Sequence, residues 1–176
     1  MHQLRLLKLL YELQPVRTTI LRSCKGLPVI DVPLQKGSQA SLPRFIAEVF
    51  ELHGIAEVGE GIVVQQDIAK VKFAHMQQRG GIPKIDEFFY TKVKDSIKKL
   101  FNKARSEGDI VLLRTIEKMR EDFIDISNIR LTSMFRAFQL KSIDVIEKNC
   151  TTEEKILVNT IKMVYDKWVK EYIEFD

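Results

Sequence analysis

Proline and glycine are confined almost entirely to the first half of this chain, and their placement constrains the fold more than any other feature. All five prolines and seven of the eight glycines come before residue 84, and only Gly108 follows. These residues favour turns and interrupt long helices. The expected fold class is therefore α+β, with a small domain of short strands and a helix at 1–62 and a helical bundle domain at 63–176.

The first half carries three segments that favour extended structure. VRTTILRS (16–23) is rich in β-branched residues and predicts a strand, and LPVIDVPLQ (27–35) predicts a second one that its prolines restrict to an edge. IAEV (55–58) predicts a third. Between the last two we expect a loop and then a helix over 42–53, with Ser41 as its N-cap.

The second half shows apolar residues at helical spacing. This periodicity predicts helices over 65–79, 85–104 and 109–139. TTEE at 151–154 resembles a capping box ahead of a last helix. The opening segment MHQLRLLKLLYELQ has its apolar run broken by charges and no small-residue cleavage site, so it predicts an amphipathic helix and not a signal peptide.

The composition is that of an ordinary globular protein, with 45% apolar and 30% charged residues. No run of about 18 apolar residues occurs, so we expect no membrane span and a cytoplasmic location. Cys24 and Cys150 stand far apart and are expected to be buried free thiols. A net charge of +4 is compatible with work near nucleic acid, although 24 carboxylates dilute it.

No group of residues suggests catalysis. His2, His53 and His75 have no acid or cysteine at catalytic or metal-ligand spacing, and the glycines at 80–81 lack the strand, lysine and helix of a phosphate loop. We expect no enzyme activity, no metal and no cofactor. The lysines at 92–105 spread around the polar side of a helix, which favours a solvated face. Weak DNA contact by Lys98, Lys99 and Lys103 is the less favoured interpretation.

The segment DISNIRLTSMFRAF (125–138) carries two apolar arcs when projected at about 100° per residue. One arc continues the stripe of the helix and should face the core: Leu131, Met134, Phe135 and Phe138. The other contains Ile126, Ile129, Ser133 and Ala137, with Arg130 between the two. A second arc suggests burial from two directions, either inside the chain's own bundle or against another subunit.

The wide apolar face of the C-terminal helix favours the second alternative, because three helices cannot cover every such surface. The interface expected on this basis contains Ile126, Ile129, Arg130, Ser133, Arg136, Ala137, Trp168 and Tyr172. The two arginines would pair there with carboxylates or backbone carbonyls.

Three segments resemble the GINS family of replication proteins. LPVIDVPL (27–34) followed by LPRFIAEVFELHGIAEV (42–58) resembles the small β-rich domain of that family, with Gln35 where its segment has tryptophan. IPKIDEFFYTKVKDSIKKLF (82–101) is similar to the helix entry of the Psf-two type of subunit, and NIRLTSMFRAF (128–138) to the family's last long helices. The resemblance covers residues 16 to 140.

The resemblance implies a replication scaffold without catalysis. The β-domain-first order is that of the Psf-two/Psf-three class, and the short length is typical of its archaeal form. The implied partners are an α-domain-first GINS subunit in a heterotetramer, the MCM helicase that the assembly activates, and a RecJ-like protein; the implied location is at the nucleoid. The alternative is a dimeric nucleic-acid-binding regulator with a helical core.

Overall fold

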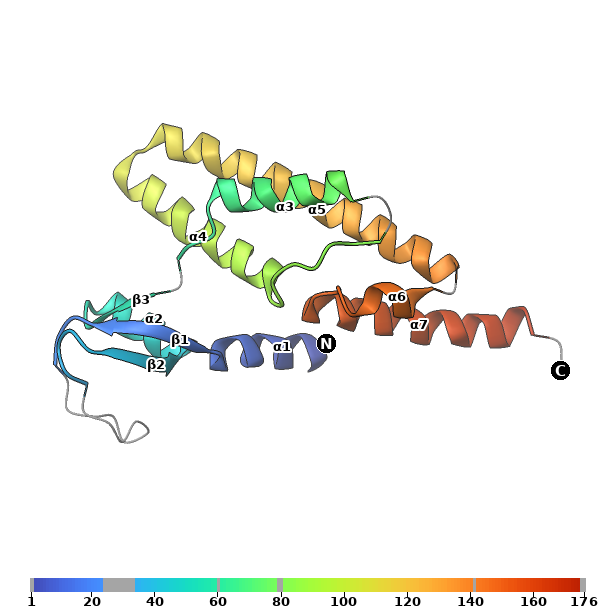
Figure 1. Cartoon of the computed structure of the whole chain (residues 1–176), viewed down its shortest axis with the longest axis horizontal. Helices are drawn as coiled ribbons and strands as arrows, with labels where there is room; N and C mark the ends of the chain where they lie inside the picture. The colour runs from blue at the N-terminus through green and yellow to red at the C-terminus, as the bar shows by residue number, and fades with distance from the viewer. Residues whose placement is uncertain (1, 24–33, 60, 79–80, 141, 175–176) are drawn as a thin grey trace. The chain divides into compact units, whose positions relative to one another are not determined.

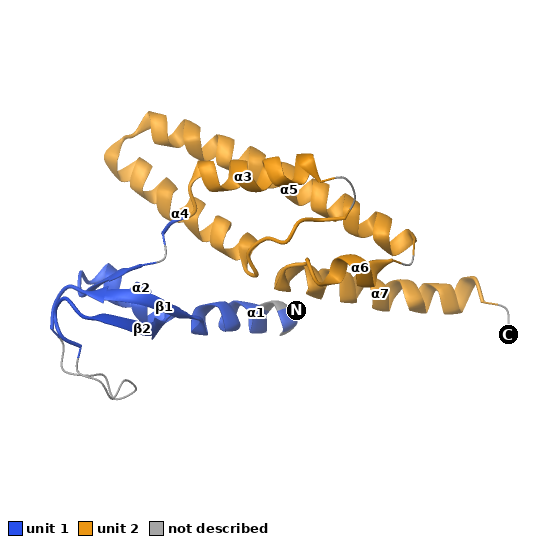
Figure 2. Ribbon diagram, in the orientation of Figure 1, with its two compact units in different colours: residues 1–62 blue, residues 63–176 orange. Residues whose placement is uncertain are grey.

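The computed structural model describes residues 2–23, 34–59, 61–78, 81–140 and 142–174 (Figure 1). The chain forms two compact units, Met1–Ile62 and Val63–Asp176 (Figure 2). Cys24 and most of the extended segment expected at 27–35 lie outside the described residues. The helical content and the small antiparallel sheet confirm the α+β class.

Unit 1 combines a three-stranded sheet with two helices. Its elements are α1 His2–Leu13, β1 Pro15–Ile20, β2 Gln39–Pro43, α2 Arg44–Leu52 and β3 Ala56–Val58. The strands run antiparallel in the order β2-β1-β3, with Val16 opposite Leu42 and Ile20 opposite Ala56. The strands predicted from the β-branched run and from IAEV are thus confirmed, as is the N-terminal helix.

Alternation along β1 explains why this sheet has one buried face. Val16, Thr18 and Ile20 are buried while Pro15 and Arg17 are exposed, which is the period-2 pattern of a strand covered on one side. The covering element is α2. The core of the unit consists of Val16, Ile20, Leu34, Leu42, Ile46, Ala47, Phe50 and Ala56.

The expected helix cap at Ser41 is wrong. Ser41 lies within β2, opposite Arg17, and α2 begins only after Pro43, without a side-chain cap. Pairing with β1 buries Leu42 in the core. Burying the Leu42 side chain stabilises the fold by about 2 kcal/mol, which is more than the roughly 1 kcal/mol that a capping hydrogen bond from Ser41 would contribute.

The described residues of unit 2 form helices and no strand. Its elements are α3 Gln65–Gln77, α4 Phe89–Glu107, α5 Ile110–Gln139, α6 Ile143–Glu147 and α7 Thr152–Tyr172. The helices expected at 65–79 and 109–139 are confirmed, and α5 runs without interruption for 30 residues. The α4–α5 turn depends on Gly108, whose φ of 68° is strained for other residues, and on Asp109, which caps α5.

The core of this unit lies where α3 and α4 pack on α5, and it contains Ile68, Phe89, Val93, Ile97, Ala104, Ile116, Met119 and Ile126. An ion pair strengthens the α3–α5 contact, since Lys72 Nζ lies 2.7 Å from Asp122 and 2.6 Å from Asp125. A smaller cluster joins the end of α5 to α6 and α7. No helix in the described part of the chain is both long and apolar enough to cross a bilayer.

Candidate partner-binding surface

Arg130 is the most completely bonded side chain of unit 2. It is 0% exposed, and all five of its N–H groups have acceptors. Nε and one terminal nitrogen bind the two oxygens of Glu154 at 2.6 and 2.7 Å. The remaining donors reach the Pro83 carbonyl, the Asn149 carbonyl and His75 Nε2. This bidentate pair with every donor used is the arrangement in which a buried arginine is tolerated.

Glu154 belongs both to the N-terminal cap of α7 and to the hydrogen-bond network of Arg130. Together with Thr151 it forms the predicted capping box of α7, which is confirmed: Thr151 N–H donates to its carboxylate, and its own N–H donates to the Thr151 hydroxyl. The same carboxylate accepts from Arg130 and from the Tyr90 hydroxyl at 2.7 Å. The network therefore ties the start of α7 to α3, α4 and α5.

The electrostatics of this network follow from its burial and its pairing. Burial by itself would raise the pKa of Glu154, but the hydrogen bonds from Arg130 and Tyr90 hold the pKa of that carboxyl below its usual range. Burial raises the pKa of the Tyr90 hydroxyl, and the charge of Glu154 adds to this. Burial also raises the pKa of the Cys150 thiol to about 11, which leaves the thiol protonated and inert at neutral pH.

The neutral form of His75 completes the network. Its Nδ1 lies 2.7 Å from the Val71 carbonyl and its Nε2 lies 3.0 Å from an Arg130 nitrogen, so Nδ1 carries the proton and Nε2 accepts. Burial lowers the pKa of His75. The bond to Val71 opposes this less strongly, and the charge of Arg130 adds to the lowering.

We therefore expect the stability of the chain to fall as the pH drops below about 6.5, the ordinary pKa of histidine. Below this pH, His75 binds a proton in the unfolded chain but stays neutral in the folded one. The free energy of unfolding should therefore fall by up to about 1.4 kcal/mol per pH unit until the pH reaches the pKa of His75 in the folded chain. Urea unfolding measured between about pH 7.5 and 5 checks this.

His75→Gln is the diagnostic variant, because a glutamine oxygen can still accept from Arg130 but does not titrate. It should flatten the pH dependence of the free energy of unfolding, which the wild type retains. Equal slopes for the wild type and the His75 variant would contradict the assignment.

The structure corrects part of the roles expected for the two arcs of α5. Ile126, Arg130 and Ala137 were expected at a partner interface, but they are buried against the chain's own helices. Arg130 therefore cannot anchor a partner, because its donors are all used within unit 2. Ile129, Ser133 and Arg136 lie at the edge of this arc, partly or fully exposed.

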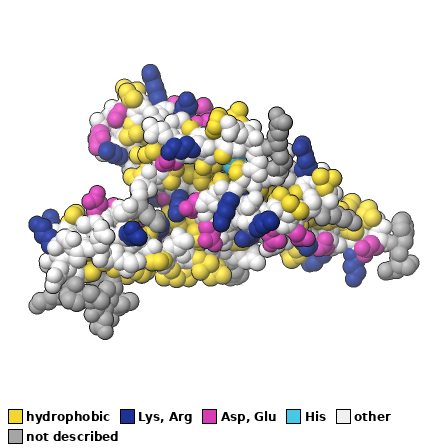
Figure 3. All heavy atoms as spheres, in the orientation of Figure 1, with side chains coloured by type: hydrophobic (Ala, Val, Ile, Leu, Met, Phe, Trp, Pro, Cys, Tyr) yellow, Lys and Arg dark blue, Asp and Glu magenta, His cyan; other side chains and the backbone are white. Residues whose placement is uncertain are grey.

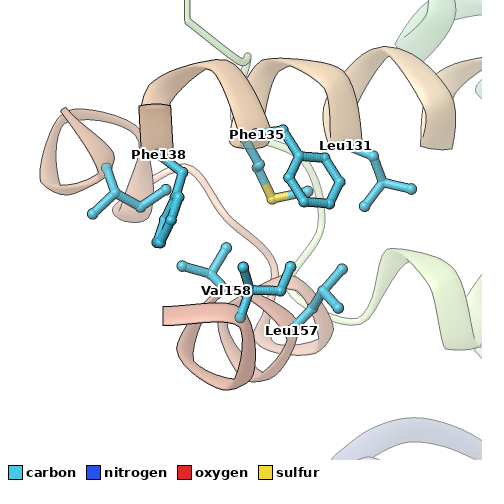
Figure 4. A pocket seen from close by; sticks show the side chains of 8 residues that line it. Leu131, Phe135, Phe138, Leu157 and Val158 are labelled. Carbon is cyan, nitrogen blue, oxygen red and sulfur yellow. The ribbon is translucent and has the colours of Figure 1, made fainter. Parts of the chain in front are cut away.

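The other arc forms core only in part. Met134 is buried, as expected, and Leu131 packs against the same cluster, but the arc also lines an apolar groove between α5 and α7. Figure 4 shows Leu131, Phe135 and Phe138 of α5 facing Leu157 and Val158 of α7. Phe135 remains 48% exposed. Met134, Ile143 and Ile161 complete the lining. The sequence carried no signal that separates the two arcs, because both are apolar and each has buried and exposed members.

The aromatic residues of α7 extend this groove. Phe138 packs edge-on against Tyr165 with ring centroids 4.8 Å apart, and Trp168 and Tyr172 follow at centroid spacings of 6.3 and 6.2 Å. Trp168 is 50% and Tyr172 is 69% exposed. Val158 is the last buried residue of α7 in the described chain. We call this surface, the groove lining together with Val164, Tyr165, Trp168 and Tyr172, the α5–α7 face. Figure 3 shows hydrophobic side chains exposed among charged ones at this end of unit 2.

The lysines considered for DNA contact lie on α4, which contributes no residue to the lining of the groove. Lys98, Lys99 and Lys103 are exposed, and Asp95 lies on the same helix. No described residues form a group of three or more metal-ligating side chains.

No protein-family model matches the chain, and no curated protein matches it either.

Proposed function

We propose that the chain is a non-catalytic scaffold subunit of a GINS-type replication assembly. In this role it combines with an α-domain-first subunit, and the assembly joins and activates the MCM helicase together with a RecJ-like protein. The protein works at the nucleoid in the cytoplasm, and its contact with DNA is indirect or weak. The single observation that carries the proposal is the uncovered α5–α7 face.

The size of this face supports an association role. Phe135, Leu157, Val164, Tyr165, Trp168 and Tyr172 are all at least 39% exposed, and together they leave on the order of 600 Å² of largely apolar surface in water. Monomeric proteins rarely expose more in one patch, and a stable interface needs about 800 Å² from each partner. The patch thus has the scale of a subunit contact.

The small β-containing unit that precedes the helices supports the choice of family. This order is that of the Psf-two/Psf-three class. The segment at 82–101 is similar to the Psf-two type, and the segments at 27–34, 42–58 and 128–138 resemble the GINS family. A scaffold needs rigid surfaces more than reactive groups, and the saturated hydrogen bonding around Arg130 serves rigidity.

Co-expression tests the proposal. With an α-domain-first GINS subunit from the same source, the chain is expected to form a defined hetero-oligomer, whose mass native mass spectrometry gives. Expressed by itself, the chain should self-associate or be poorly soluble, because the α5–α7 face stays open. A well-behaved monomer at micromolar concentration that ignores the partner subunit would contradict the proposal.

The exposed lysines of α4 favour a second candidate, the dimeric nucleic-acid-binding regulator. It requires tight binding to a fluorescent duplex or single strand with a steep dependence on salt, since lysine–phosphate contacts release counterions. The scaffold proposal expects weak anisotropy changes at about 50 mM salt, and Lys98→Glu/Lys103→Glu should leave assembly with the partner subunit intact. Tight, salt-sensitive binding that this variant abolishes would favour the regulator.

A further inference from the structure

Helix α1 of unit 1 has two apolar faces, and only one of them is used within its unit. Leu7 and Tyr11 are buried on the side where α1 packs on α2, and the guanidinium of Arg44, the first residue of α2, lies 4.4 Å from the ring of Tyr11. The second face consists of Leu6, Leu9, Leu10 and Leu13, which are 56, 50, 48 and 49% exposed. We call these four residues the leucine stripe.

The leucine stripe has the spacing of a helix-packing seam. Its members stand at i, i+3, i+4 and i+7 and fall within an arc of about 100° on the helix. The spacing is also symmetric. Leu6 and Leu13 lie equally far from the midpoint between Leu9 and Leu10, so the stripe reads the same in both chain directions.

A symmetric stripe is complementary to a copy of itself running the opposite way. In such a two-fold pair each residue i that contacts j is matched by j contacting i. Leu6 would then meet the partner's Leu13, and Leu9 would meet the partner's Leu10. A parallel pair or an unrelated helix needs no such symmetry.

The charges beside the stripe fit the same arrangement. Arg5 and Glu12 project to the same flank of the stripe, about 20° apart. In an antiparallel two-fold pair the same flanks meet, and with a rise of about 1.5 Å per residue Arg5 comes within about 3 Å, along the axis, of the partner's Glu12. Two opposite-charge pairs result. Within the chain Glu12 is 3.5 Å from Lys8 in an exposed contact, which leaves its carboxylate accessible.

From these observations we infer that the leucine stripe of α1 docks on a second copy of this chain, as an antiparallel two-fold helix pair flanked by two Arg5–Glu12 ion pairs. This goes beyond the proposed function, since it uses unit 1 and needs no GINS partner. It joins two copies of the chain, and so two copies of whatever assembly the α5–α7 face builds.

The area of the stripe sets the strength of the contact. Four half-exposed leucines offer about 350 Å² per chain, less than half of what a stable interface takes from each partner. The dimer should therefore be weak and in rapid exchange, with a dissociation constant on the order of 100 µM.

Sedimentation velocity on the full chain tests this. All samples carry Trp168→Ala, so that association through the α5–α7 face does not contribute. Between about 10 and 300 µM the chain should dimerise. Leu10→Glu should abolish the dimer, while Leu52→Glu, the same change at an exposed position of α2 in the same unit, should keep it.

Charge reversal identifies the partner as a second copy. Arg5→Glu and Glu12→Arg should each weaken dimerisation about tenfold, because each sets like charges opposite one another. An equal mixture of the two variants should recover the affinity, since every pair then joins a glutamate to an arginine.

A monomer at about 300 µM would overturn the inference and leave the stripe to a different protein. So would association that survives Leu10→Glu, or a mixture that binds no more tightly than either variant by itself.

Discussion

Replacing Glu154 with alanine is expected to lower the free energy of unfolding by about 3 to 5 kcal/mol. The change leaves the fully buried charge of Arg130 without its counterion and removes the acceptor of the Tyr90 hydroxyl. It also removes one half of the capping box of α7. Urea unfolding of the full chain followed by circular dichroism measures the loss.

Glu171→Ala is the matched control, because Glu171 is an exposed glutamate of the same helix and should cost no more than about 0.5 kcal/mol. Replacing the pair by apolar residues, as in Arg130→Met/Glu154→Leu, should not restore stability. The partly buried carbonyls of Pro83 and Asn149 and the buried His75 Nε2 would lose their donors. A double variant as stable as the wild type would show that these groups do not depend on Arg130.

Local pattern was sufficient for most of the helices. The helix at 109–139 has an apolar stripe sustained over about seven turns, and the capping box at 151–154 marks the start of the last helix. Both were predicted correctly. Where two short elements adjoin, local pattern failed. Residues 39–43 carry a serine and a proline that suit the start of a helix, and only their pairing with β1, some twenty residues earlier, makes them a strand.

The assignment of the two arcs of α5 depended on contacts that no local pattern records. An arginine among apolar residues needs an acidic counterion when it is buried. A partner subunit could supply that counterion, so the pattern is compatible with an interface. That partner is Glu154, 24 residues further along the chain, which the sequence identified only as a capping residue. Its second role could not be inferred without knowing that α7 begins beside α5.

The burial of Ile126, Arg130 and Ala137 also changes which apolar surface is exposed. Since Ile126 and Arg130 lie inside, the surplus apolar residues are those of the α5–α7 face, where Trp168 and Tyr172 were already expected. After Val158, α7 continues for some fourteen residues, none of which is buried among the described ones. Few contacts within the chain therefore stabilise this part of the helix in water. A partner that packs on this part of α7 would supply the stabilising contacts that the chain itself does not.

Trp168→Ala is therefore expected to weaken assembly with the α-domain-first partner subunit by about 30- to 1000-fold, the effect of removing a central aromatic anchor. Trp168 stands between Tyr165 and Tyr172 in the aromatic row, so the partner should enclose it on all sides. Isothermal titration with the purified partner subunit gives the affinity.

Lys167→Ala provides the control. Lys167 is the neighbouring exposed residue of α7, turned about 100° away from Trp168, and its loss should change the affinity less than threefold. Neither variant should alter the helical signal or the unfolding midpoint of the isolated chain, because no described residue of α7 beyond Val158 is buried. Equal affinities for the two variants would mean that the partner binds elsewhere. A lowered midpoint for the tryptophan variant would mean that the aromatic row already serves the fold of the chain itself.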